Sequence, residues 1–168
     1  MPVTMHSISL PLFTRMLSNL SAILDKAEAF ATAKKVDPDV LLNARLAPDM
    51  FPLKRQVQLA SDFAKGAAAR LSGQEIPKWE DNEKSFADLK ARIKRTQDYI
   101  AGFGAGQIDG SETRDVSLTI AQKPAVLKGQ AFLLNYAFPH FFFHVTTAYN
   151  ILRHNGVEVG KRDFMGPF

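Results

Sequence analysis

The sequence predicts an all-α protein built as a four-helix bundle, with one short extended excursion or hairpin before the last helix. Three observations carry this prediction. Four long stretches repeat apolar residues at steps of three and four, the connections between them are rich in Gly, Pro and polar residues, and only one stretch alternates apolar with polar residues. The length of 168 residues and the 46% hydrophobic content suit a single domain over residues 1–168.

The first predicted helix lies within residues 7–35 and carries one apolar stripe. The stripe consists of Leu10, Phe13, Leu17, Leu20, Leu24, Ala27 and Ala31. Ser7 or Ser9 is expected to cap the start of the helix, and Pro11 is expected in its first turn. A short helical piece is expected to begin at Asp37-Pro38.

The second predicted helix covers about residues 51–71 and ends at Gly73. A polar loop follows, and Trp79 is expected to be its hydrophobic anchor. The third predicted helix covers about residues 85–103, and Ser85 is placed to cap it.

The helical period then breaks. Residues 116–120 alternate apolar with polar side chains, and Lys123-Pro124 is expected to mark a turn, so a short hairpin is predicted. The fourth predicted helix covers about residues 129–154. Pro139 lies inside it and should kink or divide it.

Charge and composition exclude several classes of protein. The formal net charge is only +4, and the Lys and Arg residues are scattered along the chain, so nucleic-acid binding is not expected. No stretch approaches the roughly 18 apolar residues that a membrane span needs, and the first residues do not resemble a signal peptide. The absence of Cys removes disulfides and thiolate ligands, so the cytoplasm is the expected location.

His140 and His144 are the candidate metal ligands. They stand four residues apart, so both can face one side of a helix. Asp62 or His6 could supply a third ligand. The alternative is that both histidines are ordinary side chains within the surrounding aromatic residues, where one of them bonds a backbone carbonyl freed by Pro139.

Four more residues are candidates for lining a central cleft: Arg15, Gln58, Tyr149 and Asn150. The stretch "FPHFFFH" holds more aromatic side chains than one helix face can bury, which favours a homodimer with the fourth helix at or near the interface. The alternative is a central helix that is buried on all sides.

Two blocks, "LAPDMFPLKRQVQLASDFAKGAAARL" and "HVTTAYNILRHNGVEVGKRDFMG", resemble a bacterial family of uncharacterised proteins in the DinB/YfiT-like superfamily of proposed metalloenzymes. The resemblance covers nearly the whole chain. It implies up-down-down-up connectivity and frequent homodimers. Better-characterised members are thiol-dependent transferases and related enzymes, which hold nickel or zinc with one His from the second helix and an H-x-x-x-H pair from a later helix.

His140 and His144 resemble that pair, whereas the second helix of this chain has no His. Asp62, Ser61 or Gln58 stands near the position of the missing ligand. The leading hypothesis is therefore a small-molecule-binding or scaffold protein of unknown ligand, with no complete three-His site and no cofactor expected. The alternative is a divalent-metal enzyme of the thiol transferase or hydrolase type, in which His140, His144 and Asp62 hold nickel or zinc.

Overall fold

The computed structural model of the protein describes residues 3–167. Its elements are α1 (Met5–Lys34), α2 (Pro38–Leu42), α3 (Leu53–Ser72), α4 (Phe86–Ala101), α5 (Ala105–Ile108), the 3₁₀ turn η1 (Ser111–Thr113), β1 (Asp115–Ile120), β2 (Lys123–Lys128), α6 (Gly129–Phe132), the π-helical segment η2 (Leu133–Ala137), α7 (Phe138–His154) and α8 (Lys161–Met165). The chain is mostly helical with one small antiparallel sheet, which confirms the prediction in this coarser form.

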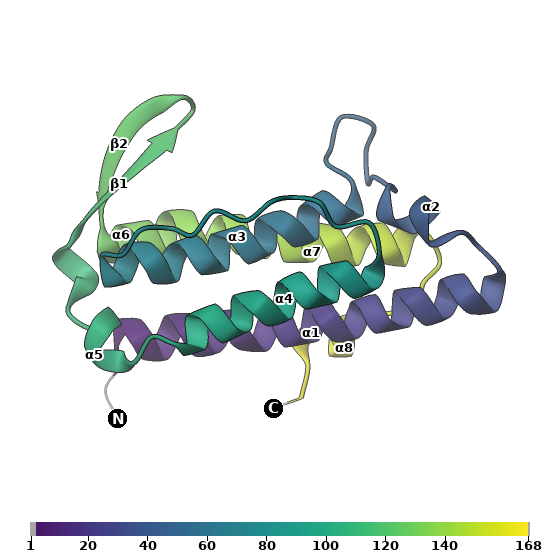
Figure 1. The fold of residues 1–168 in the computed structure, drawn as a ribbon, viewed down its shortest axis with the longest axis horizontal. Helices are drawn as coiled ribbons and strands as arrows, with labels where there is room; N and C mark the ends of the chain where they lie inside the picture. Colours follow the sequence, from purple (N-terminus) through teal and green to yellow (C-terminus); the bar gives the residue numbers. More distant parts are fainter. Residues whose placement is uncertain (1–2, 168) are drawn as a thin grey trace.

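Four long helices, α1, α3, α4 and α7, lie side by side (Figure 1). In that view α1 and α7 run in one direction, and α3 and α4 run in the other. Helix α3 packs against both α7 and α4, and α1 packs against α4. Their inward faces bury large apolar side chains, among them Phe13, Leu53, Phe86 and Phe141. No helix within residues 3–167 is both long and apolar enough to cross a bilayer.

The start of α1 differs from the prediction, because the cap is Thr4 and not Ser7 or Ser9. The Thr4 hydroxyl accepts from the Ser7 backbone N–H at 3.2 Å, and the Ser7 hydroxyl accepts from the Thr4 N–H at 2.8 Å. This reciprocal cap starts the helix earlier and lets Met5 join the buried stripe. Pro11 consequently lies inside α1, beyond the first turn in which it was expected.

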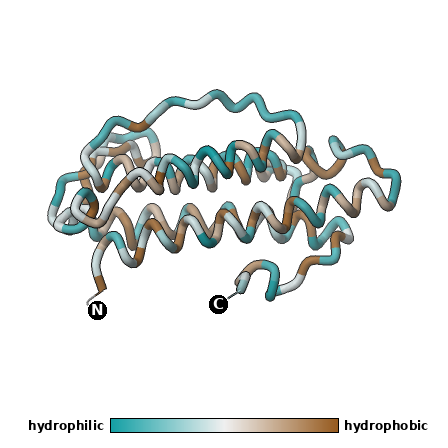
Figure 2. The backbone as a smooth tube through the Cα atoms, turned by 60° about the horizontal axis from the view of Figure 1, so that its bottom comes forward, coloured by the Kyte–Doolittle hydropathy of each residue, from teal (hydrophilic) through white to brown (hydrophobic). Residues whose placement is uncertain are grey.

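Residues 73–85, called the strap below, connect α3 to α4. Because these two helices run in the same direction, the strap must return along their whole length (Figure 1). An extended residue advances about 3.3 Å, against 1.5 Å in a helix, so a short strap can cover the length of α3. The strap is mostly hydrophilic and lies on the outside of the helices (Figure 2). It ends at Ser85, whose hydroxyl accepts from the Asp88 N–H at 3.0 Å and caps α4 as predicted.

The predicted hairpin is formed by β1 and β2, with Val116 and Leu118 buried. The turn was predicted at Lys123-Pro124 and lies at Ala121-Gln122 instead, where φ is 47° and 65°. A two-residue turn with positive φ at both positions matches the right-handed twist of paired strands. Lys123 and Pro124 are therefore the first residues of β2.

In place of the predicted kink or division at Pro139, the backbone stays helical and includes a π-helical segment just before the proline. The predicted helix over residues 129–154 is resolved into α6, η2 and α7, and Pro139 lies in the first turn of α7. Proline lacks a backbone N–H, and its ring crowds the carbonyl of the residue four positions earlier, here Asn135. A widened π-helical turn at this point relieves that conflict without breaking the path of the chain.

Candidate functional site

The two candidate histidines of α7 face α3. Both imidazole rings lie nearly parallel to the Phe63 ring, with ring centroids 4.5 Å apart for His140 and 5.6 Å apart for His144. His140 is exposed, whereas only 7% of His144 is exposed. The ring of Tyr136, one turn before His140, lies 4.5 Å from the His140 ring. The expected pair on one helix face is therefore present, and α3 adds an aromatic side chain to it.

His144 is held as a neutral imidazole. Its Nδ1 lies 2.8 Å from Gln56 Oε1, and the Gln56 amide nitrogen donates to the carbonyl of Phe51 at 2.9 Å. Gln56 Oε1 is thus the acceptor, so Nδ1 carries the proton and Nε2 carries the lone pair. Burial, followed by the charges of His140 and Arg55, lowers the pKa of His144 from 6.5 to about 4. Desolvation also lowers the pKa of His140.

Asp62 does not join the histidines. Its Oδ1 lies 2.8 Å from Lys65 Nζ and 3.0 Å from Arg92 Nη2, so two cations already occupy this carboxylate. Within residues 3–167, no group of three or more His, Asp or Glu side chains is placed to hold a metal ion. His6, the other proposed third ligand, lies at the start of α1, where its backbone N–H bonds Asp109. The His, Asp and Glu side chains of residues 3–167 therefore do not form a three-ligand metal site.

The remaining candidates contact different parts of the protein. Gln58 is buried, donates to Glu83 at 2.7 Å and lines a cavity of about 450 Å³ together with Arg55. Tyr149 packs its ring edge-on against Phe164, with centroids 5.9 Å apart. Arg15 is exposed on α1.

Asn150 lies half-buried on α7, in the turn after His144. Ser61, which directly precedes Asp62 on α3, is fully buried. Its hydroxyl has no hydrogen-bond partner among the described residues.

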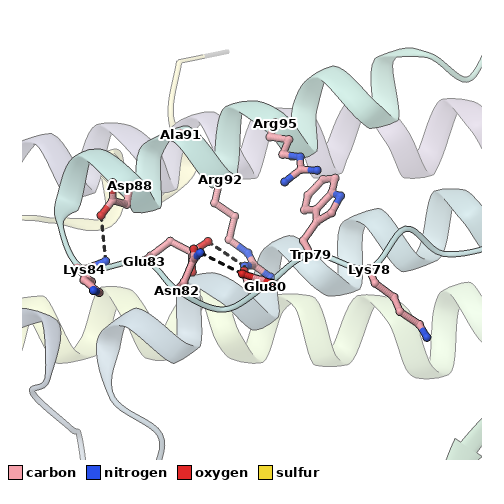
Figure 3. Close-up of a pocket in the computed structure, with 10 residues that line it drawn as sticks. All are labelled: Lys78, Trp79, Glu80, Asn82, Glu83, Lys84, Asp88, Ala91, Arg92 and Arg95. Atoms are coloured by element: carbon pink, nitrogen blue, oxygen red, sulfur yellow. Dashed lines mark hydrogen bonds and ion pairs between the residues drawn. The ribbon is translucent and has the colours of Figure 1, made fainter.

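A buried arginine fixes the strap. Only 2% of the Arg92 side chain is exposed, and its guanidinium bonds Asp62 of α3 at 3.0 Å and two strap carboxylates, Asp81 and Glu83, at 2.9 Å each. It also donates to the Glu80 carbonyl at 3.0 Å (Figure 3). Desolvation acts to lower the pKa of Arg92, but the three carboxylates outweigh it and raise that pKa. The strap is thus held on α4 by a charged group that needs these partners.

Trp79 anchors the strap, although it is half-buried and contacts cations, and not only the apolar groups that a hydrophobic anchor would need. Lys65 Nζ from α3 and the Arg95 guanidinium from α4 each lie 4.3 Å from the indole centroid, and Arg95 is visible beside the indole in Figure 3. The Tyr99 ring meets the indole edge-on, with centroids 6.1 Å apart. Cations from both neighbouring helices therefore hold the indole between them.

A cavity of about 630 Å³ lies between α3, the first half of the strap and Tyr136, and is called the α3–strap cavity below. Its aromatic wall includes Phe63, Trp79 and Tyr136, and its charged lining includes Arg70 and Lys78. Phe63 and Tyr136 are also the rings that contact His140. The cavity and the histidine pair therefore share one aromatic wall.

Sequence reasoning missed Gln56, Arg70, Arg92 and Tyr136. Two of them leave a signal in the sequence. Tyr136 stands four residues before His140, at the same spacing that separates the two histidines. Arg92 stands beside Ile93 in the apolar stripe of the third helix, at a position that faces inward. Arg70 and Gln56 leave none, because a charged or amide residue on an amphipathic helix is ordinarily solvated.

Comparisons with known proteins agree with this fold. Residues 5–165 match the family described as a domain of unknown function, DUF1993. The chain is also similar to a crystal structure described as a DinB family member protein from Shewanella denitrificans, with a TM-score of 0.87 and 47% sequence identity over 95% of this chain and 90% of that chain. No curated protein matches the sequence. The resemblance to an uncharacterised DinB-like family is thus confirmed.

Replacing Arg92 with Met should lower the free energy of unfolding by about 3 kcal/mol, because Glu83 would stay largely buried without a cation. The value lies at the low end of the range for broken buried pairs, since Asp62 and Asp81 keep contact with water. Urea denaturation measures the change. Lys94→Met, which removes an exposed pair with Asp98, is the control and should cost less than about 1 kcal/mol. Equal losses in the two variants would contradict the role given to Arg92.

The pKa of His144 predicts a specific loss of stability in acid. Because the folded pKa, about 4, lies below the unfolded value of 6.5, the unfolded chain takes up the proton first. The stabilisation is complete above pH 6.5 and falls by roughly 3 kcal/mol as the pH drops towards 4. NMR titration of the ring should give a midpoint near 4, and His144→Gln should lose this part of the pH dependence. A midpoint near 6.5 would show that the ring is not buried and neutral as described.

Proposed function

Because this chain belongs to the DUF1993 family and is DinB-like, we propose that it is a small-molecule-binding protein whose ligand occupies the α3–strap cavity. The observation that supports this proposal is the cavity itself. Its volume of about 630 Å³ falls within the size range of small-molecule sites, and its lining combines aromatic rings with a few charged groups.

The construction of the strap supports this proposal. The strap forms one wall of the cavity through Ile76, Pro77, Lys78 and Trp79. Arg92 holds the strap in place by ion pairs, so the wall is preformed and a ligand would not have to order it. Because the aromatic wall is already ordered, a ligand would lose less binding free energy to the ordering of the protein.

We also assign the four long helices to an up-down-down-up bundle and propose a homodimer. The exposed ring of Phe143 on α7 supports the dimer: 55% of this residue is exposed, and its ring lies against His144. Phe51, also 55% exposed, lies just before α3, and its backbone carbonyl accepts a hydrogen bond from the Gln56 side chain. A second chain would cover this apolar surface. A mass of one chain from light scattering at micromolar concentration would exclude the dimer.

A divalent-metal enzyme of the thiol transferase or hydrolase type is the second candidate. One observation favours it: Gln56 holds the Nδ1–H of His144, which leaves Nε2 as the lone-pair donor. The described residues supply no third ligand, because Asp62 is paired with two cations. Elemental analysis after incubation with zinc or nickel tests this candidate. Near one equivalent, lost in His144→Ala, would support it, and no bound metal would exclude it.

Filling the cavity should abolish binding without harming the fold. Gly66 lines the cavity, and a Cβ at this position would meet only the flexible end of Arg70, at 2.8 Å, and Ile76, at 4.0 Å. In Gly66→Leu the new side chain occupies the cavity, while a better helix former replaces Gly within α3. Compounds that change the emission of Trp79, the only Trp of the chain, should not do so in this variant.

Gly106→Ala is the matched control, because its new Cβ would enter open space outside the cavity. The screen uses a library of small organic compounds and follows both Trp79 emission and Tm. Compounds that act on the wild type and on Gly106→Ala, and not on Gly66→Leu, are the expected result. Compounds that act equally on all three proteins, or no active compound at all, would refute the proposed site.

A further inference from the structure

Arg70 is a half-buried cation of the α3–strap cavity that no carboxylate neutralises. Within residues 3–167, no Asp or Glu lies within ion-pair distance of its guanidinium. The neighbouring buried cations differ: Lys65 is paired with Asp62, and Arg92 with three carboxylates. Desolvation lowers the pKa of Arg70, and the nearby Tyr136 offsets only part of this effect. Apart from the Phe132 ring, whose centroid lies 5.7 Å from the guanidinium carbon, and a long contact to a backbone carbonyl, this partly desolvated charge has no partner among the described residues, and no carboxylate there neutralises it.

The helix leaves room for this guanidinium. Arg70 Nη1 lies 3.5 Å from the Gly66 carbonyl, a long contact that satisfies little of its hydrogen-bonding capacity. A Cβ on residue 66 would come within 2.8 Å of the same nitrogen. Gly in the middle of α3 costs about 1 kcal/mol of helix propensity relative to Ala. The absence of a side chain at Gly66 thus gives the Arg70 guanidinium its place in the cavity wall.

The lining of the cavity has a positive balance. Arg70, Lys65 and Lys78 face a single carboxylate, Asp62, which Lys65 and Arg92 already neutralise. The rings of Phe63 and Tyr136 supply a flat apolar surface beside these cations. A neutral ligand would leave the Arg70 charge uncompensated, whereas an anion would neutralise it.

We propose that the α3–strap cavity binds a small organic anion. Its carboxylate or phosphate group is held by the Arg70 guanidinium, and its flat apolar part lies against Phe63 and Tyr136. This inference rests on the proposed binding function and specifies the chemistry of the ligand. Arginine suits the role because its planar fork can bond two oxygens of one anion, which the point charge of lysine cannot do.

Three probes of similar shape test the inference: benzoate, phenyl phosphate and the uncharged benzamide. Each is titrated into the full chain at constant ionic strength while Trp79 emission is followed. At least one anion should bind ten times more tightly than benzamide. Arg70→Gln should weaken that anion at least tenfold and leave benzamide unchanged, and Arg70→Lys should lie between the two. Arg153→Gln, an exposed position in the last turn of α7, is the control and should change nothing.

The outcomes separate this inference from the proposed function. Tighter binding of benzoate identifies a carboxylate site, and tighter binding of phenyl phosphate identifies a phosphate site. Equal affinity for all three probes, or an equal loss of all three in Arg70→Gln, overturns the anion inference and leaves the cavity as a binding site. No binding of any probe also overturns it, and the proposed function then falls only if the Gly66→Leu screen finds no cavity ligand. Arg70→Lys keeps the charge and the packing, so it controls for misfolding of Arg70→Gln.

Discussion

The arrangement of α3, α4 and the strap depends on the ion pairs of Arg92. A guanidinium with 2% of its side chain exposed stays protonated, so its burial is costly unless carboxylates neutralise it, and here they come from α3 and from the strap. Asp62 is fixed on α3. The other two carboxylates that pair with Arg92 come from the strap, so these ion pairs hold the strap against α4. This places Trp79 between Lys65 and Arg95, and Trp79 in turn forms part of the cavity wall.

The same ion pairs occupy the carboxylate that the sequence suggested as a third metal ligand. Asp62 lies on α3, and its carboxylate neutralises Lys65 and Arg92. The histidine pair is kept, with His144 fixed by Gln56 and both rings stacked on Phe63. The chemistry on this side of the protein is therefore aromatic and cationic, and it favours the binding of an organic anion.

Local features of the fold could be predicted from the sequence. Ser85 acts through its hydroxyl, and Gly73 and Pro139 act through their backbone geometry, so the cap, the end of α3 and the π-helical segment before α7 follow from single residues. The partners of Asp62 could not be predicted, because they depend on how α3, α4 and a non-periodic strap come together. The lack of a carboxylate partner for Arg70 has the same origin: it is a property of the assembled cavity and not of the α3 sequence.

The position of Trp79 tests most directly whether Arg92 holds the strap. Acrylamide quenching of this single Trp can be compared in the wild type, Arg92→Met and Lys94→Met, under conditions where circular dichroism shows equal helical content. If Arg92 holds the strap, quenching should be slow in the wild type and in Lys94→Met. In Arg92→Met it should be close to that of a solvent-exposed Trp. Slow quenching in all three proteins would show that the strap keeps its place without Arg92, and would contradict the role given to this residue.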